Sequence, residues 1–450
     1  MLPGMRHFLA RSGPVRAFRE LRRDFSGVVF VLATGDLVAS FGFSLVFPFL
    51  TIYLVQAFGA TAFEAGLVIA GYSLCSIVSG AAGGWLADRV GRRPVMIVSV
   101  GITGLVVVLM GQAGDLAQIA ILTVVLGMID PAFIPAARAA IADVVPEERR
   151  PRAYGLLAVA ASVGWIAGPA IGAGLSRLGY PLLFAIAGVI IALYALIALR
   201  WLPETRPAVD RVAAAMGAGP VPAADPPREA RIPGGARRSV RPPVVLAAFL
   251  PLTMIIHAAT FLWVTNLPIA AARDLGVSTG AWGLLFSLNG IIIVTFQLRV
   301  AGAAERRPKP RMMALAALFY AGSYLLASAA SPAAAVAVLG GVIVVATVGE
   351  MLLFPIEPSF VSDLSPEDQR GRYQGIALAA AALGSAVGPP VGGWILDASP
   401  GPLTWWVAAA ALGLCAGGFL LLSRLAARLP RASPIALPIG GTPGAPDVAT

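Results

Sequence analysis

The sequence has few of the residues on which soluble proteins depend. Charged residues make up only 12% of the 450 positions, against about 25% in a soluble domain. The two cysteines and two histidines exclude a disulfide scaffold and leave no cluster of ligands for a metal. No phosphate-binding loop is present, so ATP hydrolysis does not drive any activity of this chain. These shortages exclude an ordinary cytosolic enzyme, and we expect neither a cofactor nor a metal.

Apolar residues are abundant and occur in long uninterrupted stretches. Residues of the types AVILMFWYC account for 58% of it, and there are 50 glycines. A helix needs about 20 apolar residues to cross a bilayer. Twelve apolar stretches follow one another, at 27–56, 62–86, 94–112, 117–138, 151–176, 181–201, 244–271, 279–300, 311–330, 333–358, 372–396 and 403–423. We therefore predict an all-α integral membrane protein with twelve transmembrane helices.

The twelve stretches form two groups of six on either side of a segment rich in proline and arginine. This segment has no apolar run long enough to pack, which is typical of a flexible linker. We predict five parts: a cytoplasmic basic arm (1–26), an N-terminal six-helix bundle (27–202), a cytoplasmic linker (203–242), a C-terminal six-helix bundle (243–425) and a disordered cytoplasmic tail (426–450).

The basic residues predict the orientation of the chain. The formal net charge is +10, yet the loops on one side of the membrane contain only Arg177 and Arg273. The positive-inside rule then places both termini in the cytoplasm of a multi-pass protein of the inner (plasma) membrane. Charge confined to one side, without interleaved aromatic residues, does not indicate nucleic-acid binding. We expect a monomer in contact with the lipid bilayer.

A shift of 220 residues aligns the first group of helices with the second. The aligned pairs include Pro48 with Pro268, Asp130 with Glu350, Pro135 with Pro355, Asp143 with Asp363, and Gly168 with Gly388. Because one register persists across several helices, the chain consists of two related halves in parallel. Such repeats place a substrate site near the midplane, between the halves.

The loop between the second and third helices has an unusual spacing of glycine, acid and base. It reads Gly84-Trp85-Leu86-Ala87-Asp88-Arg89-Val90-Gly91-Arg92-Arg93. The glycines permit a tight turn, and we expect Asp88 to face the N-terminus of a nearby helix. We expect the arginines to pair with Asp143 and to close the cytoplasmic side as a gate. The alternative is a basic loop that only sets topology.

This string resembles the loop 2–3 signature of the major facilitator superfamily. The resemblance covers nearly the whole chain, through its twelve helices, its six-plus-six division and its repeat. It implies the major facilitator fold, with two pseudo-symmetric six-helix bundles. The corresponding loop of the second half, residues 305–311, keeps only its charge.

Two further glycine-proline patterns lie in the fifth and eleventh helices. They are Gly164, Gly168, Pro169 and Gly172 in the fifth, and Gly384, Gly388 and Pro389 in the eleventh. Small residues four apart allow close helix packing, and proline bends a helix. The first pattern resembles the antiporter motif of drug–proton exchangers, with Ala173 in place of its final glycine. A packing kink without a transport role is the alternative for both.

Three carboxyl groups inside the apolar stretches are candidate proton-coupling residues. They are Asp36, Asp130 and Glu350. An ionisable group at that depth costs at least about 2.5–3.5 kcal/mol and marks a transport pathway. Such a carboxyl can exchange a proton for a cationic substrate. The alternative is a structural acid paired with an arginine or a helix end.

The surroundings of these acids resemble, and also depart from, known exchangers. Residues 349–355 resemble helix ten of proton-coupled multidrug exporters, which implies that Glu350 is functional. Thr123 stands where many antiporters of the superfamily carry an arginine, so the proton route must depend on carboxylates alone. Glu357 and Arg138, near the inner face, are more typical of structural charges.

Polar and aromatic residues on the same helices are candidates for the lining of a substrate cavity. They are Tyr72, His257, Asn266, Asn289, Trp165 and Trp263, with Gln297, Phe47 and Phe354 as weaker candidates. Polar side chains between membrane helices often only hold the helices together. An aromatic residue at one such position is often ordinary packing.

Together these features favour a secondary active transporter that exports lipophilic, cationic small molecules in exchange for protons by alternating access. A proton-coupled or facilitated importer of a small nutrient is the first alternative, although its cavity would be denser in polar or arginine side chains. An intramembrane enzyme needs a cluster of catalytic groups that the sequence lacks. A non-transporting scaffold or sensor is a remote alternative.

Overall fold

The computed structural model describes residues 24–206, 243–304, 307–366, 369–399 and 401–428. The predicted arm at 1–26, linker at 203–242 and tail at 426–450 lie almost entirely outside these residues. Twelve helical spans in the described residues are long and apolar enough to cross a membrane.

Six spans form the N-terminal half. They are α3 (Gly27–Phe58), α4 (Ala62–Val90), α5 (Arg92–Met110), α6 (Leu116–Ile129) continued by η1 (Asp130–Ala132) and α7 (Phe133–Val144), α8 (Arg150–Leu175) and α9 (Tyr180–Trp201). The fourth span runs six residues further than the sequence predicted and is interrupted at Asp130. Pro131, which has no N–H to donate, explains the interruption.

The other six spans form the C-terminal half. They are α11 (Pro243–Arg273), α12 (Thr279–Ala304), α13 (Lys309–Ser328), α14 (Ala335–Leu364), α15 (Arg370–Ala398) and α16 (Leu403–Arg428). The twelve predicted spans are thus confirmed, with boundaries that differ by a few residues.

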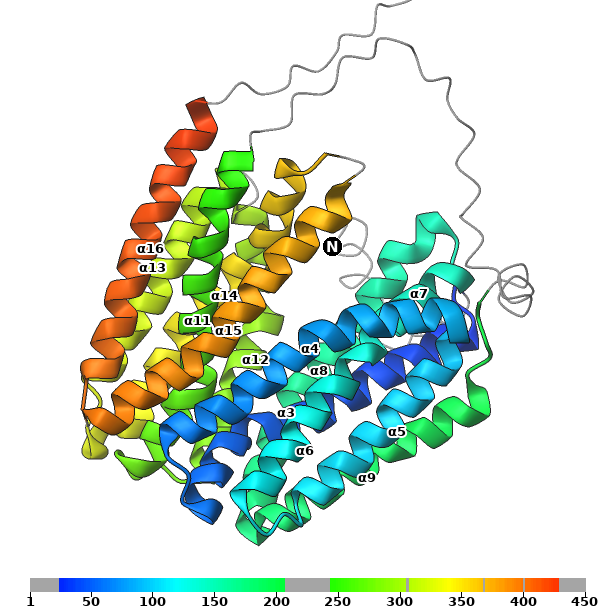
Figure 1. The fold of residues 1–450 in the computed structure, drawn as a ribbon, viewed down its shortest axis with the longest axis horizontal. Helices are drawn as coiled ribbons and strands as arrows, with labels where there is room; N and C mark the ends of the chain where they lie inside the picture. Colours follow the sequence, from blue (N-terminus) through cyan, green and yellow to red (C-terminus); the bar gives the residue numbers. More distant parts are fainter. Residues whose placement is uncertain (1–23, 207–242, 305–306, 367–368, 400, 429–450) are drawn as a thin grey trace, which may run out of the picture.

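The same helix pairs form the core of each half. The helix α3 packs on α8 and α5 packs on α9, as α11 packs on α15 and α13 packs on α16 (Figure 1). The main contacts between the halves are those of α4 with α15 and of α8 with α12, and α3 also packs on α11. The arrangement is two pseudo-symmetric bundles joined chiefly along these helices.

Glycines explain why α8 and α15 approach their partners so closely. A Cβ atom at Gly164 would lie 2.6 Å from the backbone nitrogen of Phe41 on α3, and one at Gly168 would overlap the hydroxyl of Ser44. In the second half, Cβ atoms at Gly384 and Gly388 would overlap backbone carbonyls of α11. The repeated glycine pattern therefore gives the same close helix contact twice.

The prolines of the same motifs face the opposite half. The carbonyl of Pro169 would lie 2.7 Å from a Cβ atom at Gly283 of α12, and the backbone of Pro389 would lie 2.6 Å from one at Gly66 of α4. Each motif thus packs against a helix of its own half at its glycines, and its proline backbone packs against a glycine of the other half. The packing interpretation of these motifs is what the geometry supports.

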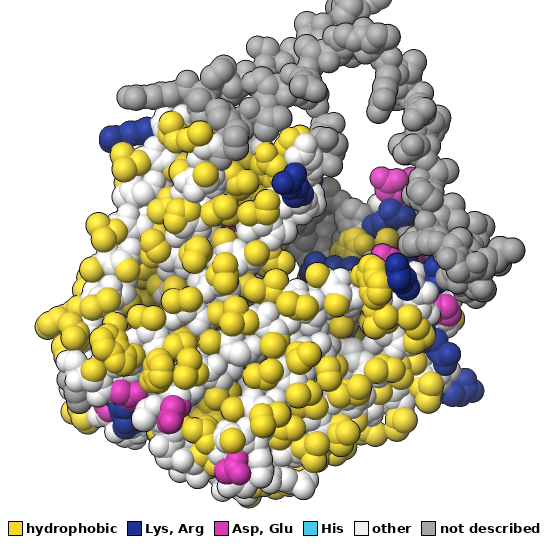
Figure 2. All heavy atoms as spheres, viewed as in Figure 1, with side chains coloured by type: hydrophobic (Ala, Val, Ile, Leu, Met, Phe, Trp, Pro, Cys, Tyr) yellow, Lys and Arg dark blue, Asp and Glu magenta, His cyan; other side chains and the backbone are white. Residues whose placement is uncertain are grey.

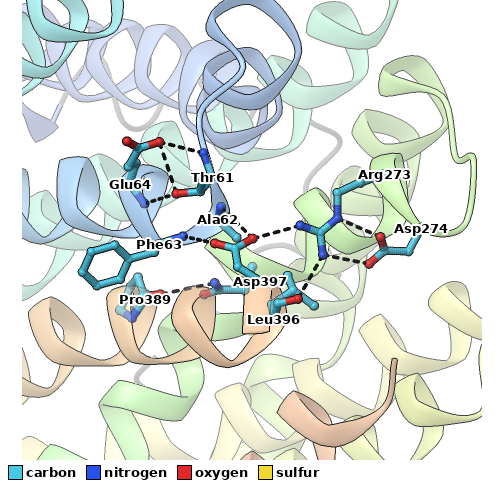
Figure 3. A network of polar contacts seen from close by, with 10 residues as sticks. Thr61, Ala62, Phe63, Glu64, Arg273, Asp274, Pro389, Leu396 and Asp397 are labelled. Carbon is cyan, nitrogen blue, oxygen red and sulfur yellow. Dashed lines mark hydrogen bonds and ion pairs between the residues drawn. The ribbon is translucent and has the colours of Figure 1, made fainter. Parts of the chain in front are cut away.

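The halves are joined most firmly at the end where the chain turns after α3 and after α15. Here the carboxylate of Asp397 accepts the backbone N–H groups of Ala62 and Phe63 at 3.2 and 2.9 Å and pairs with Arg273 at 3.0 Å (Figure 3). The hydroxyl groups of Tyr180 and Thr279 make a second cross-half hydrogen bond, 3.2 Å long. We call this the closed end.

The halves diverge toward the opposite end, which we call the open end (Figure 1). The surface is hollowed between them there, and hydrophobic side chains cover most of the visible face (Figure 2). Charged side chains gather toward the two ends (Figure 2). A belt of exposed apolar residues, with Leu414 79% and Val78 69% exposed, suits contact with lipid.

Candidate functional site

Glu350 lies on α14 in the interior of the C-terminal half. The side-chain amide of Asn289, on α12, donates to the Glu350 carboxylate at 2.8 Å and to the hydroxyl of Thr347 at 3.0 Å. Tyr320 of α13 is also close enough to interact electrostatically with Glu350. The sequence predicted that Asn289 lines a substrate cavity. In the structure Asn289 is 8% exposed and is a hydrogen-bond partner of Glu350.

Asp130 takes the corresponding place in the N-terminal half, at the break between α6 and α7. Its carboxyl interacts with the hydroxyl of Tyr72, on α4. The helices α4 and α12 are the second spans of their respective halves. The structure therefore places each acid beside a polar side chain of the equivalent helix, although Tyr72 and Asn289 do not align in the repeat.

Tyr72 also belongs to a cluster of aromatic rings. Phe43 stacks on Phe47 with ring centroids 4.6 Å apart and lies 5.7 Å from the ring of Trp165. Tyr72 lies 5.9 Å from Phe43 and 6.2 Å from Phe47. We call these four residues, which come from α3, α4 and α8, the aromatic cluster. Trp165 is 37% exposed, so the cluster reaches the surface of its half.

Asp36, the third predicted proton-coupling acid, lies apart from this cluster on α3. Asp36 interacts electrostatically with Arg138, on α7, and with Tyr194, on α9. The role of Asp36 in proton coupling stays a prediction.

His257 contacts another acid. Its Nε2 atom lies 2.8 Å from the carboxylate of Glu357, and both side chains are 12% exposed. The pair joins α11 to α14, and Glu357 lies about two helical turns after Glu350 on α14. The interpretation of Glu357 as a structural charge agrees with this contact.

Two predicted cavity residues, Asn266 and Trp263, are buried within the C-terminal half. Asn266 is 0% exposed, donates to the carbonyl of Pro389 at 3.2 Å, and accepts from Thr265 at 2.9 Å. Trp263 is 3% exposed and stacks on Phe286. Both contact other helices of the C-terminal half, Asn266 through its hydrogen bond to Pro389 on α15 and Trp263 through its ring contact with Phe286 on α12.

The predicted gating loop forms a network inside the N-terminal half. The guanidinium group of Arg92 lies 3.0 Å from Asp143 and 3.1 Å from Asp88. The predicted partnership with Asp143 is therefore confirmed for Arg92. The structure pairs Asp88 with Arg92, four residues further along the chain, where the sequence predicted a helix N-terminus as its partner.

Sequence reasoning missed the partner of this loop. The carboxylate of Glu204 accepts the backbone N–H groups of Arg92 and Arg93 at 3.0 and 3.2 Å, which caps the N-terminus of α5. The guanidinium of Arg206 donates to the carbonyl of Arg89. An acid three residues beyond the end of an apolar helix, α9, was the available signal. The described residues contain no group of three or more His, Cys, Asp or Glu able to hold a metal.

Comparison with known proteins identifies the architecture. A sequence model of the Major Facilitator Superfamily matches residues 32–349 and 249–442. The chain is 25% identical over 379 residues to the uncharacterized MFS-type transporter YqjV of Bacillus subtilis (strain 168), covering 83% of this chain and 88% of the relative. It is 36% identical over 176 residues to the multidrug resistance protein MdtG of Serratia proteamaculans (strain 568), covering 37% and 42%.

Solved structures give the same architecture. The structure superposes on that of the peptide transporter POT with a TM-score of 0.72 at 16% identity, covering 89% of this chain and 94% of the other. A bacterial homologue of the human lysosomal transporter Spinster, in an inward-facing and occupied conformation, gives 0.67 at 16% identity, covering 92% and 98%. At these identities the likeness shows the fold alone.

Proposed function

We propose that this chain, which belongs to the Major Facilitator Superfamily, is a secondary active transporter that exports lipophilic cations in exchange for protons. The observation that carries the proposal is the pair of interior acids. Glu350 and Asp130 occupy equivalent positions of the two halves, and each has one polar partner on the second span of its half. Intramembrane acids of this kind mark ion pathways.

The aromatic cluster supports a cationic, lipophilic substrate. The faces of Phe, Tyr and Trp rings attract cations as well as apolar surface. The partial similarity to MdtG, a multidrug resistance protein, is consistent with this class of substrate.

We propose that the open end faces the cytoplasm. The loop of Arg89, Arg92 and Arg93 lies at this end, whereas the closed end carries the acids Asp115, Asp274 and Asp397 with only Arg177 and Arg273 as basic residues. The positive-inside rule therefore favours an inward-facing conformation of the structure, with both termini in the cytoplasm of the inner membrane.

Alternating access then couples the export of the cation to the import of protons. A cation from the cytoplasm enters between the halves and binds when the interior carboxyls lose their protons. Rocking of the halves opens the other side, where protons replace the cation. A carboxylate can hold a proton or attract the cation, so one transported species displaces the other.

The test uses the protein in liposomes with an inward-directed proton gradient and a fluorescent lipophilic cation. We expect the wild type to move the cation against its gradient and the Glu350→Gln variant to lose this activity. Glu148→Gln, at an exposed glutamate of η2 (Glu147–Arg149), is the matched control and should keep it.

Retained proton-dependent export in Glu350→Gln would overturn the assignment of that residue. Movement of a neutral or anionic solute, with no movement of the cation, would overturn the export proposal and favour an importer of a small nutrient.

A further inference from the structure

A cavity lies inside the N-terminal half, behind the aromatic cluster. Its volume is about 20 Å³, which accommodates a water molecule or a group of similar size. Its polar lining residues are Tyr72, Thr103, Thr123 and Asp130, and rings of Phe43 and Phe47 complete the wall on the side of the cluster.

Thr103, on α5, indicates that this cavity is built for an occupant. Its side chain is 4% exposed, and its hydroxyl oxygen has no hydrogen-bond partner among the described residues. Thr123 lines the same cavity, but its hydroxyl donates to the carbonyl of Ile119 at 2.8 Å. A buried hydroxyl without a partner is costly, so a group that fills the cavity and bonds to Thr103 stabilises it.

The cavity offers three oxygen acceptors, which belong to Asp130, Tyr72 and Thr103. A primary ammonium group has three N–H donors. We propose that the cavity receives the primary ammonium group of a lipophilic substrate, while the apolar part of the substrate lies against the aromatic cluster. This inference rests on the proposed function and specifies the class of cation it transports.

The route into the cavity passes the aromatic cluster. Phe43 lines the cavity and also contacts Trp165, which is 37% exposed. Ring faces at the entrance attract a cation, and the Asp130 carboxylate behind them provides the opposite charge. A quaternary trimethylammonium group is larger than a water molecule and has no N–H to donate, so the cavity excludes it and Thr103 remains unpartnered.

The experiment compares two ligands with the same apolar tail, a primary amine and its trimethylated quaternary analogue. Their binding to the full-length protein in lipid nanodiscs is measured by calorimetry at pH 7 without any gradient, with empty nanodiscs as the blank. We expect the primary amine to bind about tenfold more tightly, as for a charged hydrogen bond gained. Thr103→Val should weaken the amine about tenfold and leave the quaternary ligand unchanged.

Thr253→Val is the matched control, because its buried hydroxyl likewise has no hydrogen-bond partner among the described residues but lies on α11, outside the lining of the cavity. This variant should keep the preference for the primary amine. Equal affinities of the two ligands, or unchanged amine binding in Thr103→Val with the protein folded, would show that the cavity holds only a water molecule and would overturn the inference.

The outcomes separate this inference from the proposed function. A preference for the primary amine without proton-driven export would sustain the ammonium site and refute the exporter. Proton-driven export of primary and quaternary cations with equal affinity would sustain the exporter and refute the ammonium site.

Discussion

The carboxylate of Asp397, in the C-terminal half, accepts the backbone N–H of Phe63, in the N-terminal half, at 2.9 Å (Figure 3). Asp397 also accepts from Ala62, while Thr61 and Glu64 form a capping box at the same helix start. The first three N–H groups of α4 are therefore satisfied, two of them by the other half. An acid at a helix N-terminus is stabilising, so this contact favours the conformation in which the closed end is shut.

Asp397→Asn should shift the protein toward the conformation in which the closed end opens. Loss of the charge at the helix N-terminus removes about 1 kcal/mol, which corresponds to roughly a fivefold change in the ratio of conformations. Electron–electron resonance between spin labels at Gln112 and Ser331, with Cys75 and Cys415 replaced by alanine, would report the separation.

The matched control is Asp115→Asn, because Asp115 caps α6 of its own half through the N–H of Gln118. It should leave the distance distribution unchanged. A distribution that is equally unchanged in Asp397→Asn would mean that the cross-half contact does not bias the conformations.

Gly168→Ala should destabilise the protein, because the added Cβ atom would overlap the hydroxyl of Ser44 on α3. Overpacking of this kind costs about 1–3 kcal/mol. Thermal unfolding in detergent would measure it. Gly174→Ala, where nothing lies within 4 Å of the added atom, should be neutral. Equal stability of the two variants would contradict the packing role of the motif.

Arg92→Gln should also lower stability, because Arg92 bonds Asp88, Asp143 and the carbonyl of Ala87. We expect a loss of about 2 kcal/mol in the same unfolding assay. Arg89→Gln removes only an exposed guanidinium over the ring of Trp85 and should cost less. The reverse order of the two variants would show that the network inside the loop contributes little.

Cation binding should weaken as the pH falls. In the proposed exchange, protons and the cation compete for the same interior carboxyls, so the apparent Kd is expected to rise by up to about tenfold per pH unit when one proton is released per cation bound. Calorimetric titrations of the lipophilic cation from pH 5 to pH 8 would measure this slope. Glu350→Gln should flatten it and Glu148→Gln should retain it, whereas a slope shared by both variants would assign the proton to another residue.

The two interior acids show how far the sequence could lead. The shift of 220 residues aligned Asp130 with Glu350, and the structure places both in the interior of their halves. Their partners could not be predicted, because Tyr72 and Asn289 lie on equivalent helices at positions that the repeat does not align. Whether a polar side chain turns toward an acid depends on the rotation of its helix, which only packing fixes.

Other residues show the same limit. Asn266 and Trp263 are residue types that suit a cavity, and the structure buries both against helices of their own half. Glu204 and Asp397 have the composition of ordinary loop acids, yet each caps a helix that begins more than a hundred residues away. A residue type indicates which bonds are possible, and the neighbouring element decides which are made.

The sequence by itself determined the twelve spans, their division into two halves and the fact that the helices lie in a membrane. Those features follow from apolar length and from the need of every backbone group in lipid to bond within its own helix, which are local properties. Only the tertiary structure decided which end is closed, which side chain meets each interior acid and where the cavity beside Asp130 lies. These depend on contacts between residues far apart in the chain, such as Asp397 with Phe63, and their geometry exists only once the two bundles have packed.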